Sequence, residues 1–236
     1  MQKYKLKVFD NKEDLTIFST KIVANILREY LLQKDRIQVA LSGGSTPAEM
    51  YKLLGEELLD WEKIDLFLGD ERWVHHDDNS SNTRLINRTI LSSSKGKKAT
   101  FHTVPTTQLK TVEDSSKELD KLLRMNCSGD PAVFDLILLG LGDDGHTASL
   151  FPGSESLSIK DRWTASTYAN GHSRITLTFP VLSAAKQVVF LVSGDSKKVA
   201  LKRLIDPNES PLRTPAKLVN PISEILILTD QSIHQD

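Results

Sequence analysis

The sequence predicts an α/β protein whose mostly parallel sheet is covered by helices on both faces. Short apolar runs typical of buried strands alternate along the chain with longer segments whose apolar residues recur at helical spacing. Ile37–Leu41 and Val188–Val192 are nearly continuous apolar runs, as expected of strands buried on both faces. No internal repeat or long linker interrupts the alternation, so we expect a single domain over residues 1–236.

The expected strands follow from apolar runs and from period-two alternation. Tyr4–Phe9 alternates polar and apolar residues, which is typical of an edge strand. Pro180 is expected to end the strand that runs from Arg174 to Phe179. The remaining expected strands are Ile37–Leu41, Leu66–Leu68, Thr100–Val104, Leu136–Leu141, Arg174–Phe179, Val188–Val192 and Ile225–Leu228.

Helices are expected where apolar residues recur every three to four positions. These segments are Asp14–Leu32, Pro47–Leu59, Thr83–Leu91, Ser115–Met125 and a stretch that runs from after Gly194 to about Ile205. For the second helix the sequence predicts an N-cap at Thr46, Pro47 at the first helical position and a capping box completed by Glu49.

Composition narrows the class of protein. Of the 236 residues, 39% are hydrophobic and 26% charged, and a formal net charge of −1 argues against nucleic-acid binding through bulk charge. No apolar run is long enough to span a bilayer, and Met1–Val8 lacks the apolar core of a signal peptide. Cys127 is the single cysteine and fits a reducing compartment. We expect a cytoplasmic monomer that binds a small molecule and neither nucleic acid nor membrane.

The turn from Gly142 to His146 is the most informative segment. It follows an apolar run and places Asp143 and Asp144 beside the histidine. Ligands bind beyond the carboxyl ends of parallel strands, and a histidine beside carboxylates suits proton transfer near neutral pH. A lone histidine is more often structural than catalytic, but this context favours catalysis. We expect a helix to begin at Thr147.

Three other expected strands also end in turns with glycine and polar residues. The turn after Ile37–Leu41 leads into an expected helix, and the free N–H groups at a helix start favour binding of a phosphate. A strand-to-helix turn that binds nothing and is simply well capped would show the same sequence pattern. This turn comprises Ser42, Gly43, Gly44, Ser45 and Thr46. It matches no nucleotide-binding loop. Because these turns share one edge of a parallel sheet, we expect them to converge on one pocket.

Charged residues near the remaining turns are candidate anion ligands. Arg72, in the Gly-Asp-Glu-Arg stretch from Gly69, could hold a phosphate in bidentate geometry, while Asp70 or Glu71 could do acid/base work or orient Arg72. Weaker candidates are Arg174 and, in the turn after Val188–Val192, Lys197 or Lys198. The alternative for each is a solvated surface charge. The run from His75 to Asp78 lacks metal-ligand spacing, and no metal site is expected.

Four motifs together resemble the 6-phosphogluconolactonases of the glucosamine/galactosamine-6-phosphate isomerase superfamily. The motifs are ALSGGSTP at 40–47, GDER at 69–72 with Ser81-Asn82, LGLGDDGHTASLFPG at 139–153 and RITLTFP at 174–180. The resemblance implies the modified Rossmann-like α/β fold that this family shares with ribose-5-phosphate isomerases. It also implies hydrolysis of 6-phospho-D-glucono-1,5-lactone to 6-phospho-D-gluconate, a step of the pentose phosphate pathway that needs no cofactor.

The resemblance also implies roles for the site residues. His146 is the general base that activates water, and Asp144 orients it. The turn at 42–46 and Arg72 hold phosphate or other substrate oxygens, with Lys197 and Arg174 as further ligands. Asp143 departs from the family, which commonly has proline there.

Two alternative functions belong to the same superfamily. A glucosamine-6-phosphate deaminase would share the Ser-Gly-Gly turn and the Asp-Gly-His segment. It would continue as Ile-Ala-Phe-Asn-Glu-Pro, whereas Thr147-Ala-Ser-Leu-Phe-Pro stands here and lacks the glutamate that partners the histidine. A non-catalytic sugar-phosphate sensor would usually carry a helix-turn-helix segment, for which the sequence shows neither room nor charge.

Overall fold

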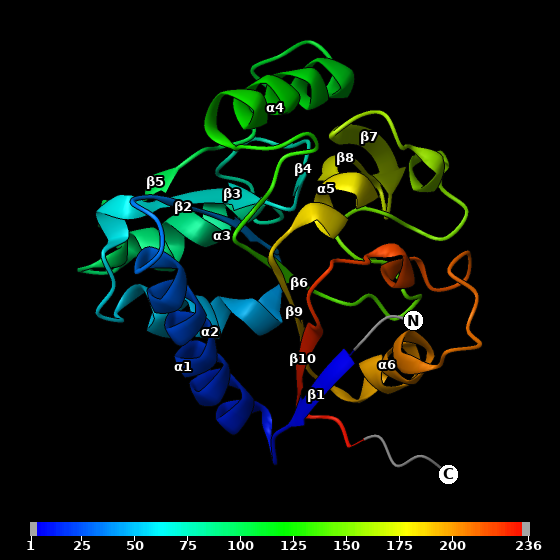
Figure 1. Ribbon diagram of the computed structural model, residues 1–236. Coiled ribbons are helices and arrows are strands. Elements are labelled where there is room, and N and C mark those ends of the chain that lie inside the picture. The colour runs from blue at the N-terminus through cyan, green and yellow to red at the C-terminus, as the bar shows by residue number, and fades with distance from the viewer. Residues whose placement is uncertain (1–3, 233–236) are drawn as a thin grey trace.

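A seven-stranded parallel sheet forms the centre of the computed structural model, which describes residues 4–232 (Figure 1). The strand order is β1–β10–β9–β6–β2–β3–β5, and each neighbouring pair is parallel. The strands are β1 (Tyr4–Val8), β2 (Ile37–Leu41), β3 (Ile64–Leu68), β5 (Thr100–Phe101), β6 (Leu136–Leu139), β9 (Gln187–Val192) and β10 (Ile225–Thr229). The predicted fold class is confirmed, and β1 is an edge strand as expected.

Six α-helices are described outside this sheet. They are α1 (Lys12–Leu31), α2 (Ser45–Gly55), α3 (Asn82–Arg88), α4 (Val112–Asn126), α5 (Phe179–Ala184) and α6 (Lys198–Ile205). Figure 1 shows α1 and α2 on one side of the sheet and α5 and α6 on the other. The start of α1 is fixed by Asn11, whose side chain accepts a hydrogen bond from the backbone N–H of Asp14 at 2.9 Å.

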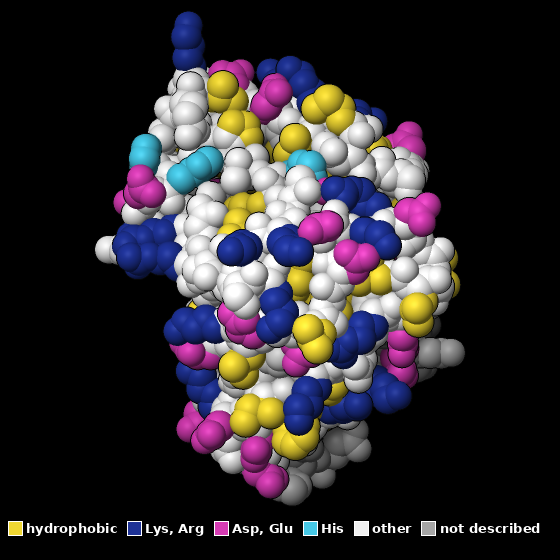
Figure 2. Space-filling view, turned by 90° about the vertical axis from the view of Figure 1, so that its left-hand side faces the viewer, with side chains coloured by type: hydrophobic (Ala, Val, Ile, Leu, Met, Phe, Trp, Pro, Cys, Tyr) yellow, Lys and Arg dark blue, Asp and Glu magenta, His cyan; other side chains and the backbone are white. Residues whose placement is uncertain are grey.

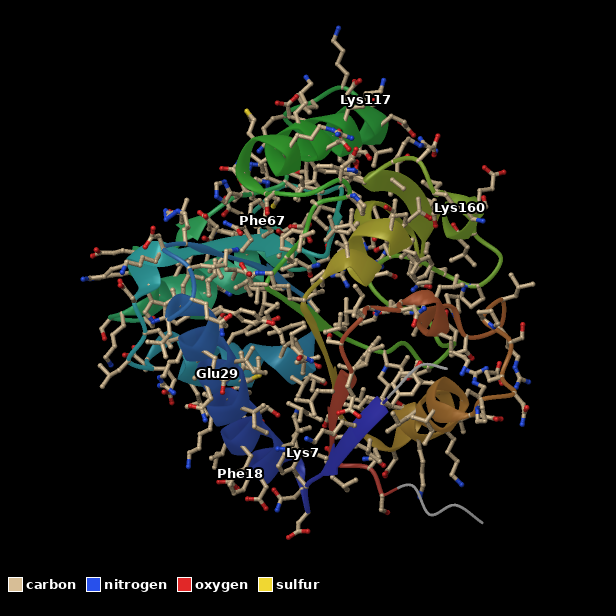
Figure 3. All side chains as sticks on the ribbon, in the orientation of Figure 1. Lys7, Phe18, Glu29, Phe67, Lys117 and Lys160 are labelled. Atoms are coloured by element: carbon tan, nitrogen blue, oxygen red, sulfur yellow. The ribbon has the colours of Figure 1, made fainter. Side chains whose placement is uncertain are left out.

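The central strands form the core. Every residue of β2, β3, β6 and β10 is buried, as the continuous apolar runs predict. Phe67 on β3 packs edge-on against Phe134, with ring centroids 5.4 Å apart. In Figure 3, Phe67 lies in the interior, whereas Phe18 and Lys117 lie at the periphery on α1 and α4.

A second, three-stranded antiparallel sheet was not predicted. It consists of β4 (Asp70–Arg72), β8 (His172–Leu177) and β7 (Thr164–Ala169), in that order. The prediction of a strand at Arg174–Phe179 was therefore wrong about its end, because the strand stops at Leu177. Phe179 opens α5, and Pro180 fits its first turn, where the missing N–H is tolerated.

The capping box predicted for α2 is also wrong. The helix begins at Ser45 with Gly44 as its N-cap, and no side chain caps it. Gly44 has φ 112°, which lets the chain enter the helix two residues early. Glu49 instead forms an ion pair with Lys52 at 2.8 Å.

No helix begins at Thr147, contrary to expectation. Its hydroxyl donates to the carbonyl of Gly140 at 2.8 Å, and the next residue, Ala148, has φ 48°. A left-handed residue there is incompatible with a right-handed helix.

The remaining boundary errors are at element ends. The second helix stops at Gly55 and not at Leu59, β5 stops at Phe101 and not at Val104, and β6 stops at Leu139 and not at Leu141. The segment expected as one helix over Thr83–Leu91 is α3 followed by a separate 3₁₀ turn at Ile90–Ser92. Errors of this size are common where the end of a helix or strand has no distinctive capping residue.

Charges of both signs are interspersed over the face shown in Figure 2, in keeping with the formal net charge of −1. Within residues 4–232, no helix combines the length and the apolar character needed to cross a membrane.

Candidate active site

A cavity of about 270 Å³ opens at the carboxyl ends of the central strands. The turns after β2, β6 and β9 contribute to its lining, and these three strands are neighbours in the sheet. The chain runs outward from β2 through β3 to β5 and then returns to β6 on the other side of β2, so the cavity lies where the strand order reverses. Ligands bind at such switch points in α/β sheets.

The lining brings together most of the residues singled out from the sequence. Those from the candidate list are Ser42, Gly43, Gly44, Ser45, Thr46, Arg72, His146, Arg174 and Lys197. Asp144 is not part of the lining, but its carboxylate is hydrogen-bonded to His146, which is. Asp70 and Asn82 also line the cavity, as do Gly140, Gly142 and Ser193.

The turn at 42–46 brings backbone into the cavity. A Cβ on Gly43 would lie 1.9 Å from Oδ1 of Asn82, so only glycine fits against that side chain. The hydroxyl of Tyr51 donates to the carbonyl of Ser42 at 2.9 Å and holds the turn from behind. The start of α2 therefore offers unpaired N–H groups to an anion.

His146 and Asp144 form a tight pair. The ring Nδ1 of His146 lies 2.6 Å from Oδ1 of Asp144, which also accepts the backbone N–H of His146 at 3.0 Å. Gly142 makes room for this pair, because a Cβ there would lie 2.0 Å from the same Nδ1. The imidazole also packs on the ring of Phe151, with ring centroids 4.2 Å apart.

The pKa of Asp144 lies below its usual range. Partial burial raises the pKa, but the hydrogen bonds from the ring and backbone of His146 lower it further than burial raises it. The carboxylate is consequently ionised throughout the neutral range, as a partner of an imidazole must be.

Asp143, which the sequence left unexplained, is bound to Lys197. The ammonium Nζ lies 2.7 Å from Oδ1 of Asp143, and Ser196 donates to the same oxygen at 3.2 Å. The hydrogen bond from Lys197 holds the pKa of Asp143 below its ordinary value. Asp143 is 61% exposed and lies outside the cavity lining, so it faces Lys197 from the rim and not His146.

Two arginines come from the small sheet. Arg72 on β4 and Arg174 on β8 are register partners. Nη1 of Arg72 donates to the carbonyl of Ser80 at 2.5 Å, whereas its buried Nε has no hydrogen-bond partner among the described residues. Arg174 has a side chain only 7% exposed. Burial and then the charge of Arg72 lower the pKa of Arg174, although a guanidinium stays charged in proteins.

The sequence and structure comparisons decide the family. A family model described as glucosamine-6-phosphate isomerases/6-phosphogluconolactonase matches residues 10–228. A 6-phosphogluconolactonase from Synechocystis sp. is 38% identical over 227 residues, which cover 95% of this chain and 94% of the relative. The chain belongs to this family.

Solved structures agree with that membership. A 6-phosphogluconolactonase from Shewanella baltica superposes with a TM-score of 0.86 at 26% identity, covering 96% of this chain and 97% of the other. One from Thermotoga maritima has a TM-score of 0.83 at 29% identity, covering 97% and 99%. The resemblance stated from the motifs is confirmed.

Within this family member, the two acidic residues of the GDER motif have different surroundings. The Glu71 carboxylate is fully buried and accepts hydrogen bonds from the backbone N–H groups of Arg72, Asn82 and Thr83 and from the Ser81 hydroxyl. It fixes the start of α3 and does not line the cavity. Asp70 lines the cavity, which makes it the candidate for contact with a ligand.

Three cavity features escaped sequence reasoning. Asn82 supports the turn at Gly43, Ser149 donates to Asp70, and Phe151 supports the His146 ring. All three lie in motifs that carried the resemblance, which was the available signal. The His75–Asp78 run lies elsewhere, and residues 4–232 hold no cluster of three potential metal ligands.

Proposed function

We propose that this chain hydrolyses 6-phospho-D-glucono-1,5-lactone to 6-phospho-D-gluconate, with His146 as general base. The observation that carries this proposal is the His146–Asp144 pair, which is placed on a cavity that also holds a glycine-rich helix start and three cationic side chains. The lactonase relatives, similar over nearly the full chain, support the choice of reaction.

The geometry supports a specific proton path. An ionised carboxylate can only accept, so Nδ1 of His146 carries the proton donated to Asp144. Nε2 is then the unprotonated nitrogen and takes a proton from water as the water attacks the lactone carbonyl. The imidazolium, stabilised by Asp144, returns a proton to the ring oxygen when the C–O bond breaks.

The cationic groups have complementary tasks. The substrate carries a phosphate at one end, and hydrolysis creates a carboxylate at the other. Lys197 and the N–H groups of the turn at 42–46 suit the phosphate, because both present donors to an anion at the cavity edge. The buried Nε of Arg72, which has no hydrogen-bond partner within residues 4–232, lets this side chain stabilise either anionic end or the negative oxygen that forms at the carbonyl.

The site lacks a residue that the deaminase alternative needs. The Thr147–Phe151 segment contains no glutamate that could partner His146, and Phe151, which stands where the deaminase pattern has that glutamate, packs on the His146 ring. A non-catalytic sensor has no need for the base and carboxylate arrangement at 2.6 Å.

A side-by-side assay tests the proposal. The purified chain is given freshly made 6-phosphogluconolactone and, separately, glucosamine 6-phosphate, and the rate of spontaneous lactone opening is subtracted. We expect acceleration of lactone opening and no release of ammonia. Ammonia release, or lactone opening at the background rate, would overturn the assignment.

We also propose that the chain works as a monomer in the cytoplasm. The single cysteine suits a reducing compartment.

A further inference from the structure

Asp70 is a buried carboxylate on the cavity wall that the proposed proton path does not use. It is the first residue of β4, its side chain is 9% exposed, and it lies in the cavity lining. Buried carboxylates without partners are costly, so each of its oxygens must be accounted for.

The two oxygens of Asp70 are unequally satisfied. Oδ2 accepts a hydrogen bond from the Ser149 hydroxyl at 2.5 Å and lies 3.8 Å from a guanidinium nitrogen of Arg174. Oδ1 has one long contact, 3.5 Å from the amide nitrogen of Asn82. That amide nitrogen makes its shorter hydrogen bond, 2.8 Å, to the backbone carbonyl of Asp70. Oδ1 consequently retains acceptor capacity.

The donor and acceptor inventory of the substrate shows what can use this capacity. An ionised carboxylate only accepts hydrogen bonds. The phosphate dianion, the lactone carbonyl and the ring oxygen of the substrate also only accept. The donors on this ligand are its ring hydroxyl groups.

We propose that Asp70 is a specificity-determining residue, whose Oδ1 accepts a hydrogen bond from a ring hydroxyl of the bound lactone. This assignment rests on the proposed lactonase function and adds the group that reads the sugar hydroxyls. Cationic residues and N–H groups recognise the anionic ends of the substrate, and Asp70 recognises its polyol part.

Asp70 is held rigidly enough for this task. Its backbone pairs with Thr176 across β4 and β8. The backbone N–H of Ser149 donates to the Thr176 hydroxyl at 3.2 Å, which anchors the residue that holds Oδ2. Sites built to pair with a substrate hydroxyl discriminate strongly against analogues that lack it, because the protein group is then left unpaired.

The test is a cycle of substrate and protein changes. The 2-, 3- and 4-deoxy analogues of the 6-phospho-lactone are prepared, and kcat/KM is measured for each with the wild type, Asp70→Asn, Asp70→Ala and the control Asp161→Asn. Asp161 is 87% exposed and is not part of the cavity lining, so its variant loses the same charge without changing a residue of the site. Circular dichroism and thermal melting establish that each variant is folded.

We expect the wild type and Asp161→Asn to lose about 10- to 100-fold in kcat/KM on one of the three deoxy lactones. Asp70→Ala should lose a similar factor on the parent lactone but little more on that same analogue, and Asp70→Asn, whose amide keeps one acceptor oxygen, should lose less on the parent. Losses that do not add show that removing the hydroxyl from the substrate and removing the carboxylate from the protein abolish the same interaction.

Two results would overturn the assignment while leaving the proposed function intact. One is a wild type that hydrolyses the parent and all three deoxy lactones equally well, a result that needs no folded variant. The other is an Asp70 variant whose loss is the same for parent and analogues, which indicates that Asp70 only balances the charge of Arg174. A wild type that fails to accelerate opening of the parent lactone overturns the proposed function and this assignment together.

Discussion

The cavity has two walls of different construction. One wall consists of turns that follow parallel strands, where His146, the turn at 42–46 and Lys197 lie. The other is the small antiparallel sheet, whose β4 and β8 supply Asp70, Arg72 and Arg174. The turn wall presents backbone N–H groups and a partly exposed base, whereas the sheet wall presents charges fixed by strand pairing and by neighbouring side chains.

The difference indicates a division of labour. Proton transfer needs an imidazole that can reach water, and the His146 side chain is 25% exposed. Recognition of a polar substrate needs groups that do not move, and the Arg174 and Asp70 side chains are 7% and 9% exposed. Substitutions at or beside His146 in the turn wall should therefore change mainly kcat, and those in the sheet wall should change substrate recognition and stability as well.

Removing the base should have the largest effect. We expect His146→Ala to lower kcat by about 10²- to 10⁴-fold, because general-base assistance is lost, while the melting temperature changes little for a partly exposed side chain. The lowered pKa of Asp144 keeps its carboxylate ionised at neutral pH, so the partner of the base is in its charged form during this measurement. A folded His146→Ala enzyme with near wild-type kcat would contradict the mechanism.

Crowding the base should have the next largest effect. In Gly142→Ala the added methyl would lie 2.0 Å from Nδ1 and 2.7 Å from Oδ1 of Asp144. The ring must move, so we expect kcat to fall by about 10- to 100-fold with a smaller change in KM. The matched control is Gly69→Ala, which lies outside the cavity lining and where a Cβ meets only the Leu41 carbonyl oxygen at 3.6 Å, an ordinary contact distance. Equal kcat values for the two variants would show that the Gly142 position does not set the place of the imidazole.

A charge-conserving change tests the sheet wall. Nε of Arg174 donates to the carbonyl of Ala169 at 3.2 Å, and its guanidinium lies over Phe151, 5.4 Å from the ring centroid. Lysine cannot reproduce both contacts, so Arg174→Lys should lower kcat/KM about 10-fold and reduce the free energy of unfolding by about 1–3 kcal/mol. Kinetics and urea unfolding measure the two effects. An Arg174→Lys variant with wild-type kcat/KM and a wild-type free energy of unfolding would show that this wall tolerates a mobile cation.

The two walls also differ in how far they could be predicted from the sequence. The turns after β2 and β6 were recognisable because a buried parallel strand leaves a continuous apolar run, and glycine with polar residues directly follows it. In the sheet wall, Arg72 and Arg174 were recognisable as candidate anion ligands, but the antiparallel sheet that brings them together was not. The three residues of β4 are too few to show alternation, and β4 pairs with β8 about a hundred residues later in the chain. The helix expected at Thr147 was wrong for a related reason, because tertiary contacts hold Ala148 in a left-handed conformation that no local pattern announces.

The smallest expected effect lies at the rim of the turn wall. Asp143→Asn removes the exposed partner of Lys197, so the ammonium loses a competing anion and should bind substrate phosphate more tightly. Because solvent screens the pair, we expect KM to fall by no more than about fivefold, with kcat unchanged. The sign of the pH dependence follows from the lowered pKa of Asp143. Its carboxylate is ionised above that pKa and neutral below it, so the difference in KM between wild type and variant should be present at neutral pH and vanish on strong acidification. Measurement of KM against pH and ionic strength checks this, and a raised KM in Asp143→Asn would show instead that Asp143 positions Lys197 for the phosphate.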